Sequence, residues 1–177
     1  MAGRIFAVVG PSGAGKDTLM AEAATRHPAL YIARRTITRP EEAGGEPFEG
    51  VSEAEFARRK AAGDFLLDWQ AHGLCYGIGR DVDRAVGEGR DVLFNGSRGV
   101  LGRAWEAFPN LSVIHVTASA PVLAARLAAR GRESAEDIER RLARAAYEIP
   151  NGPAIRVVQN DGDLADAVAA FVAALSR

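Results

Sequence analysis

Residues 10–17 read Gly-Pro-Ser-Gly-Ala-Gly-Lys-Asp, and this stretch decides the fold. Its spacing, G-x-x-x-x-G-K, is that of a phosphate-binding loop, except that an aspartate stands where a serine or threonine is expected. The apolar run Ile5–Val9 precedes the loop and is typical of a buried strand, and the helix formers of residues 18–24 follow it. The sequence therefore predicts a strand–loop–helix unit that binds phosphate groups.

The composition of the loop explains how it would bind them. Glycines lack a Cβ atom, so the backbone can curl around an anion with its N–H groups inward, and the helix that follows adds partial positive charge. Lys16 brings a full charge to the β- and γ-phosphates of a nucleotide, and we expect it to be catalytic. A glycine-rich turn without a ligand is the alternative, which the strand, helix and lysine together disfavour. The nucleotide-binding residues expected here are Gly10, Pro11, Ser12, Gly13, Ala14, Gly15, Lys16, Asp17 and Thr18.

Length and composition indicate one soluble globular domain. The chain has 177 residues, of which 47% are hydrophobic and 25% charged, with a formal net charge of −1. That balance does not favour nucleic acid or a charged membrane as a partner, and no apolar stretch is long enough to span a bilayer. Because no secretory signal is evident either, we expect a cytoplasmic protein that acts on a small-molecule substrate.

Apolar runs alternate with helical patterns along most of the chain, which favours a parallel sheet with crossover helices. We predict an α/β fold of the P-loop NTPase type, with a doubly wound parallel sheet, an inserted acceptor-binding lobe and a helical lid. The single domain, 1–177, would divide into a core of about 1–33, 81–125 and 150–177, an acceptor lobe of about 34–80 and a lid of about 126–149.

The insertion has local signals of its own. Ser52 as N-cap with Glu55 three residues on predicts a capped helix that ends at Gly63. Two paired short strands are expected near 65–69 and 74–77. Residues 38–50 hold two prolines and three glycines and are predicted to form a loop.

Arginines gather at the start of the insertion, at Arg34, Arg35 and Arg39. The planar guanidinium matches phosphate oxygens in a bidentate way, so the cluster fits an acceptor that already carries phosphate. Alternatively, these arginines form a solvated basic face paired with Glu41 and Glu42. Of the three, Arg39 is the one for which phosphate binding is most favoured over this alternative.

A second basic group lies on either side of Gly131. Arg130 ends one predicted helix and Arg141 is on the next, which Ser134 would open, so the two could converge over a triphosphate. There they would stabilise charge on the transferring phosphoryl group, and we assign both a catalytic role. Ion pairs on the helix surface, with Glu133, Glu136 and Glu139, are the alternative.

Taken together, these residues resemble guanylate kinase in order and spacing over nearly the whole chain. The resemblance is carried by the loop and by Thr38-Arg39-Pro40 with Gly45-Glu46, Val51–Phe56, Tyr76-Gly77, Arg130-Gly131, Arg140-Arg141-Leu142 and Val158-Gln159-Asn160-Asp161. It implies that a core, a monophosphate-binding lobe and a lid close around ATP, Mg²⁺ and the acceptor. By the same resemblance, Asn160 would lie near the adenine.

The departures from that family concern the acceptor. Phe48 stands in place of a tyrosine that binds the acceptor phosphate, Ile78 in place of a serine that contacts guanine, and residues 94–98 in place of an acidic pair. A site built on hydrogen bonds tolerates such losses poorly, which argues against GMP. The same departures resemble the ribose 1,5-bisphosphate phosphokinases, a branch that also shares Gly15-Lys16-Asp17, Ile37–Pro40, Ala43–Glu46, Ala71–Leu74 with Tyr76–Ile78, and Asn95–Arg98. That resemblance implies transfer of the γ-phosphoryl of ATP to ribose 1,5-bisphosphate.

The expected acceptor-binding residues are Arg35, Arg39, Asp68, His72, Tyr76, Asn95 and Arg98. Asp17 is expected to act on Mg²⁺ directly or through water, because Mg²⁺ accepts oxygen ligands. ATP and Mg²⁺ are thus the expected cofactors. A GMP kinase is the nearest alternative, and a non-catalytic peptide-binding module is disfavoured because the loop and Lys16 are intact.

Overall fold

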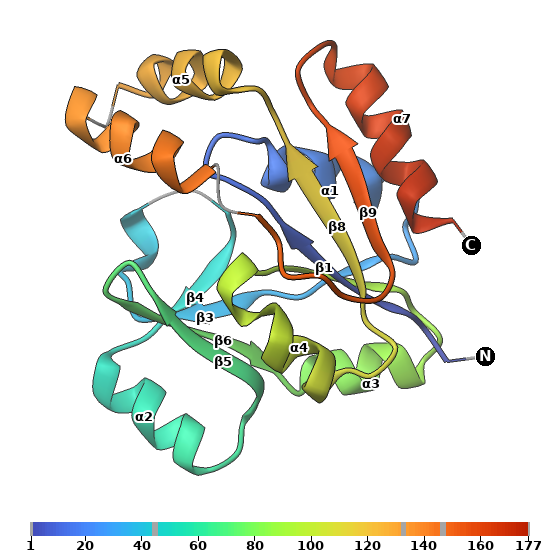
Figure 1. Cartoon of the computed structure of the whole chain (residues 1–177). Helices are drawn as coiled ribbons and strands as arrows, with labels where there is room; N and C mark the ends of the chain where they lie inside the picture. The colour runs from blue at the N-terminus through green and yellow to red at the C-terminus, as the bar shows by residue number, and fades with distance from the viewer. Residues whose placement is uncertain (1, 44–45, 132–133, 146–147, 177) are drawn as a thin grey trace.

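The apolar run before the loop is strand β1 (Ile5–Val9), and it lies at the centre of a parallel sheet. The computed structural model describes residues 2–43, 46–131, 134–145 and 148–176. Within them, five parallel strands form this sheet in the order β2 (Tyr31–Ile32), β7 (Val92–Asn95), β1, β8 (Ser112–Thr117) and β9 (Ile155–Gln159) (Figure 1). The predicted parallel α/β core is confirmed.

Helices cover both faces of this sheet, which is why β1 is apolar at every position. Phe6 and Val8 pack on one face, in a core shared with α1 (Lys16–Arg26), α5 (Ala120–Ala129) and α7 (Leu164–Leu175). Ala7 and Val9 pack on the other, with α3 (Asp81–Gly87) and α4 (Leu101–Ala107), the latter entered through a 3₁₀ turn, η2 (Arg98–Val100). The phosphate loop therefore leaves β1 at the carboxyl edge of a sheet that is fixed on both sides.

The insertion folds as a second, four-stranded sheet. Its order is β4 (Phe48–Gly50), β3 (Arg35–Ile37), β6 (Leu74–Gly79) and β5 (Phe65–Ala71), with α2 (Glu53–Ala61) beside β5 and a 3₁₀ turn, η1 (Glu41–Ala43), before β4. The predicted loop over 38–50 is wrong at 48–50, since β4 pairs in parallel with β3. Three residues are too few to show a strand period, so this pairing has a tertiary cause. Gly44 and Gly45 lie outside the described residues.

Local signals within the insertion are confirmed. The Ser52 hydroxyl accepts a hydrogen bond from the Glu55 backbone N–H at 3.1 Å, and Gly63 follows α2 with φ +76°. His72 and Gly73 join β5 to β6 with φ values of +54° and +74°, the two-residue turn that matches the twist of a hairpin. The side chain of His72 is thereby fixed at the tip of the hairpin.

The segment predicted to form a lid contains α6 (Ala135–Ala145), which packs beside α5. The Asp137 backbone N–H donates to the Ser134 hydroxyl at 3.1 Å, so the predicted helix start is confirmed. Two short helices, α3 and α4, were not predicted: each has seven residues, and neither begins with a side-chain cap. No helix among the described residues has the length and hydropathy needed to cross a membrane.

Candidate active site

The phosphate loop, residues 10–15, is held in shape by two glycines whose neighbours leave no room for a side chain. A Cβ atom on Gly10 would lie 2.0 Å from the Val116 carbonyl oxygen, and one on Gly15, where φ is +92°, would lie 2.5 Å from Asn160 Nδ2. Any other residue at either position would push the loop out of place. The spacing of glycines in the sequence thus has a direct steric cause.

Lys16 begins α1 and folds back over the loop. Its Nζ donates to the carbonyl oxygens of Gly10 at 2.9 Å and Pro11 at 3.1 Å. Burial lowers the pKa of the Lys16 ammonium to about 8, and the nearby Asp17 carboxylate offsets this only in part. An anion at this position would restore the ordinary pKa, so the site favours phosphate.

The lowered pKa predicts a pH dependence of nucleotide binding. Below pH 8 the Lys16 side chain is protonated, and its positive charge attracts the phosphates of ATP. Above pH 8 the side chain loses the proton and with it this charge. We expect the Kd for ATP, measured by calorimetry, to rise by up to about tenfold per pH unit above this pKa. Lys16→Arg keeps its charge and should give a flat profile; equal slopes for the two proteins would contradict the assignment.

Asn160 and Arg126 support the loop from behind. Asn160 Nδ2 donates to the Ala14 carbonyl oxygen at 2.8 Å, while Arg126 donates to the carbonyl oxygens of Gly13 at 3.2 Å and Asn160 at 2.7 Å. The Asn160 residue is only 5% exposed. The NH₂ group of Asn160 is thus directed at the loop, and the expected place of this residue near the adenine stays a prediction.

Loss of this support should lower both stability and nucleotide affinity. Asn160→Ala leaves the Ala14 carbonyl without its buried donor, and we expect the free energy of unfolding in urea to fall by about 1–3 kcal/mol. The KM for ATP should rise in parallel. Asn110→Ala, at an exposed turn, is the matched control and should change neither quantity; an equal effect of the two variants would rule out a role of Asn160 in holding the loop.

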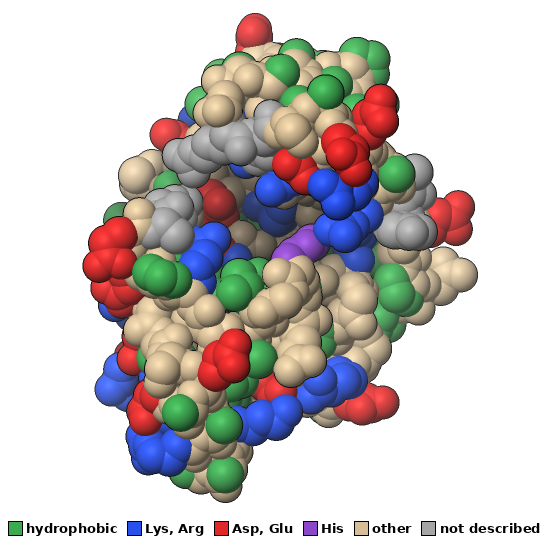
Figure 2. Space-filling view, turned by 90° about the vertical axis from the view of Figure 1, so that its left-hand side faces the viewer, with side chains coloured by type: hydrophobic (Ala, Val, Ile, Leu, Met, Phe, Trp, Pro, Cys, Tyr) green, Lys and Arg blue, Asp and Glu red, His purple; other side chains and the backbone are tan. Residues whose placement is uncertain are grey.

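A cavity of about 630 Å³ opens beside the loop, between the two sheets and α6. Seven arginine or lysine side chains and three carboxylates line it. Figure 2 shows basic side chains gathered around a hollow in the surface, with a histidine beside them. The lining includes Gly10, Pro11, Ser12, Lys16, Asp17, Arg35, Arg39, Glu46, Trp69, His72, Tyr76, Asn95, Arg98, Asp137, Arg140, Arg141 and Arg144. Such a charge balance suits substrates that carry several phosphates.

The structure brings six of the seven predicted acceptor-binding residues to this cavity. Asp68 is the exception. Its carboxylate pairs with Lys60 Nζ at 2.6 Å and with Arg103 Nη2 at 3.6 Å, and it does not line the cavity. The expectation that Asp68 contacts the acceptor therefore finds no support in its placement, since two neighbouring cations already hold it.

A chain of polar contacts crosses the cavity from Asp17 to Arg35. Asn95 Nδ2 donates to Asp17 Oδ1 at 2.8 Å and lies 3.5 Å from Glu46 Oε2, and Glu46 forms an ion pair with Arg35. Arg35 also lies over the ring of Tyr76, at 5.0 Å from its centroid, and burial lowers the pKa of Arg35 to about 10. Glu46 was not predicted as a site residue, although it belongs to the Gly45-Glu46 motif.

Helix α6 closes the cavity from above. Arg141 Nη1 donates to the Ser12 hydroxyl at 2.8 Å, and Arg98 donates to the Ala145 carbonyl oxygen at 3.2 Å. Arg98 thus reaches the carboxyl end of α6, where a cation is favoured. Arg130 ends α5, is exposed and lies outside the cavity lining, although its charge contributes to the low pKa of Lys16. Arg132 lies outside the described residues.

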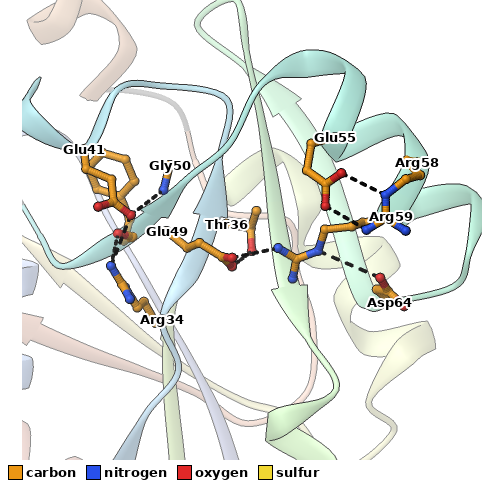
Figure 3. A network of polar contacts seen from close by, with 10 residues as sticks. Arg34, Thr36, Glu41, Glu49, Gly50, Glu55, Arg58, Arg59 and Asp64 are labelled. Carbon is orange, nitrogen blue, oxygen red and sulfur yellow. Dashed lines mark hydrogen bonds and ion pairs between the residues drawn. The ribbon is translucent and has the colours of Figure 1, made fainter.

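Two other residues considered from the sequence do not line the cavity. Thr18 is exposed on α1 and does not line it. Arg34 donates to the Phe48 carbonyl oxygen at 2.6 Å and pairs with Glu41, and it does not line the cavity (Figure 3). The same network ties Arg59 to Glu49 at 2.9 Å, so it braces the lobe rather than the site.

Comparisons with known proteins agree with this geometry. The family model described as guanylate kinase matches residues 2–176. A crystal structure of guanylate kinase from Anaplasma phagocytophilum superposes with a TM-score of 0.70 at 19% identity, covering 98% of this chain and 85% of that one, which shows a shared fold. The fold and the loop thus define the class as P-loop kinases.

Two relatives narrow the class. The ribose 1,5-bisphosphate phosphokinase of Ruegeria sp. (strain TM1040) is 52% identical over 94% of this chain and 88% of its own length. The enzyme of the same name from Chromobacterium violaceum is 50% identical over 93% of this chain and 89% of its own length. The chain belongs to the guanylate kinase family, within its branch of ribose 1,5-bisphosphate phosphokinases.

Proposed function

We propose that this protein transfers the γ-phosphoryl group of ATP to ribose 1,5-bisphosphate, forming 5-phosphoribosyl 1-diphosphate and ADP. The observation that carries the proposal is the 52% identity to the Ruegeria enzyme, which extends over 94% of the chain. The basic cavity beside the loop supports it, because both substrates carry several negative charges. The protein acts as an ATP-dependent phosphotransferase.

The nucleophile in this reaction is an oxygen of the acceptor's 1-phosphate. It is anionic at neutral pH, so no general base is required. A bond forms between this oxygen and the γ-phosphorus, the bond from the γ-phosphorus to the bridging oxygen breaks, and ADP leaves with the electron pair. Catalysis then rests on alignment and on neutralising charge.

The residues of this chain supply both the alignment of the substrates and the neutralisation of charge. Lys16 and Arg141 lie at the loop and would hold the donor phosphates, while Arg39 and Tyr76 line the acceptor side. In this proposal residues of about 34–80 act as the acceptor lobe and those of about 126–149 as the lid. The position of α6 above the cavity supports that division.

Mg²⁺ fits the donor set at the start of α1. Asp17 places a carboxylate in the cavity next to Lys16, and Asn95 orients it at 2.8 Å. Among the described residues, no group of three or more His, Cys, Asp or Glu side chains could hold a metal by itself. Asp17 would therefore share the ion with phosphate oxygens and water, as Mg²⁺ prefers. When bound, the ion neutralises phosphate charge.

Product analysis tests the proposed function. Enzyme, ATP, Mg²⁺ and ribose 1,5-bisphosphate are mixed, and ³¹P NMR follows the reaction. We expect the diphosphate resonances of 5-phosphoribosyl 1-diphosphate to appear in step with ADP, and little ADP with GMP as acceptor. Formation of ADP with GMP, and none with the bisphosphate, would assign guanylate kinase activity instead.

A further inference from the structure

Helix α6 presents a basic face to the cavity. Arg140, Arg141 and Arg144 all line it, at the i, i+1 and i+4 spacing that places side chains on one side of a helix. The first of these pairs with the carboxylate of Asp137 at 2.6 Å. The other two reach toward different lobes, so they can serve different substrates.

Arg141 contacts the donor loop and Arg144 contacts the acceptor lobe. Arg141 Nη1 lies 2.8 Å from Ser12 Oγ, whereas Arg144 Nη1 lies 2.9 Å from Nδ1 of His72. Three residues of helix advance only about 4.5 Å along the axis, so one helix bridges the two substrate sites. The hairpin tip of the acceptor lobe and the lid therefore meet at Arg144 and His72.

This pair places a guanidinium beside an imidazole, two groups that can each donate a hydrogen bond to an anion. Arg144 contacts the ring of His72, whereas Arg140 pairs with the carboxylate of Asp137. Burial, Arg144 and Arg141, in that order, lower the pKa of His72, which shows that the ring's charged form is disfavoured here. Both residues are exposed at the rim of the cavity, where a solute can reach them. Arg144 Nη1 donates to Nδ1 of the neutral ring, and an anion that displaced this contact would accept hydrogen bonds from both side chains.

We propose that Arg144 and His72 jointly bind a phosphate group of the acceptor and so favour an acceptor with two phosphates over one with a single phosphate. This inference rests on the proposed function, since it assigns a subsite for the same acceptor. The remaining cavity arginines on the lobe, Arg35 and Arg39, would serve the other phosphate. A phosphate bound by Arg144 and His72 would also hold the lid against the lobe.

Steady-state kinetics on the full chain test this subsite. In Arg144→Ala, we expect the KM for ribose 1,5-bisphosphate to rise roughly tenfold or more at low salt, because a charge-assisted hydrogen bond is lost. The KM for ATP should stay within about twofold. Arg141→Ala should show the reverse pattern, and Arg58→Ala, an exposed pair with Glu55 on α2, should match the wild type.

Further variants separate binding from a structural role. Arg144→Lys keeps the charge and should recover part of the acceptor affinity. Adding His72→Ala to Arg144→Ala should raise the acceptor KM by less than the product of the single effects, because both side chains bind one group. Thermal melts show whether each variant is folded.

The outcomes distinguish this subsite from the proposed function. Turnover of ribose 1,5-bisphosphate by the wild type, with an unchanged acceptor KM in folded Arg144→Ala, would overturn the subsite and leave the function intact. An equal rise in the KM values of ATP and acceptor would also overturn it, because it would indicate a general effect on the lid. Absence of wild-type turnover would overturn both.

Discussion

Replacement of Lys16 by methionine is expected to lower kcat/KM roughly 10³-fold or more. Side chains that stabilise charge on a transferring phosphoryl group contribute effects of about this size. Lys16 Nζ lies 2.9 Å from the Gly10 carbonyl oxygen, over the loop in which the β- and γ-phosphates would lie. Methionine has a similar length and no charge, so the variant removes the interaction and keeps most of the packing.

The sequence offers a matched control, because Lys60 is the only other lysine in the chain. Lys60 lies on α2, with its side chain 58% exposed, and pairs with Asp68. Lys60→Met should retain wild-type kinetics in a coupled assay for ADP. Denaturation in urea shows whether both variants are folded. Wild-type ADP formation by folded Lys16→Met would contradict the site as a whole.

Sequence reasoning predicts the parts of this fold that are local. The strand–loop–helix unit, the Ser52 cap and the start of α6 each depend on residues within a few positions of one another, and all are present. Strand β4 and helix α4 depend on distant partners instead. Strand β4 is formed by pairing with β3. Helix α4 has no side-chain cap and is held by Leu101 and Ala104, which are buried in the core.

The candidate site follows the same division. Lys16 was predicted from the spacing of the loop motif, and Arg39 and Arg98 from arginines near strand ends, and all three line the cavity. Arg126 lies in the last turn of α5, close to Arg130, but its side chain donates to the Gly13 carbonyl oxygen and so supports the loop from behind. The direction of a side chain depends on tertiary neighbours, and residue type and spacing do not determine it.

Glu46 and Arg144 show what sequence alone misses. Glu46 is an acidic residue in a basic site, and only its ion pair with Arg35 explains its place in the cavity. Arg144 is one of several arginines on α6, and only the position of His72 at a hairpin tip distinguishes it from Arg140. In both cases the partner is more than ten residues away in sequence.

Asp17→Ala is expected to reduce kcat about 10²-fold, the effect of losing one group that positions charge at the transferring phosphate. It should also raise the Mg²⁺ concentration needed for half-maximal rate. The reason is that Asp17 is the carboxylate beside Lys16, oriented by Asn95, where the loop motif ordinarily has a hydroxyl. The loss of an acidic residue from the first turn of α1 costs only about 0.3–1 kcal/mol of stability, so the variant should fold.

Two substitutions at the same position separate charge from coordination. Asp17→Ser supplies the hydroxyl that the motif ordinarily has, and it should recover more activity than Asp17→Asn, whose amide oxygen is a weaker Mg²⁺ ligand. Rates are measured over a Mg²⁺ titration at fixed ATP. If Asp17→Ala kept both its turnover and its Mg²⁺ requirement, the carboxylate would have no part in holding the ion. Asp17 would then serve only to fix the Asn95 side chain at the acceptor end of the cavity.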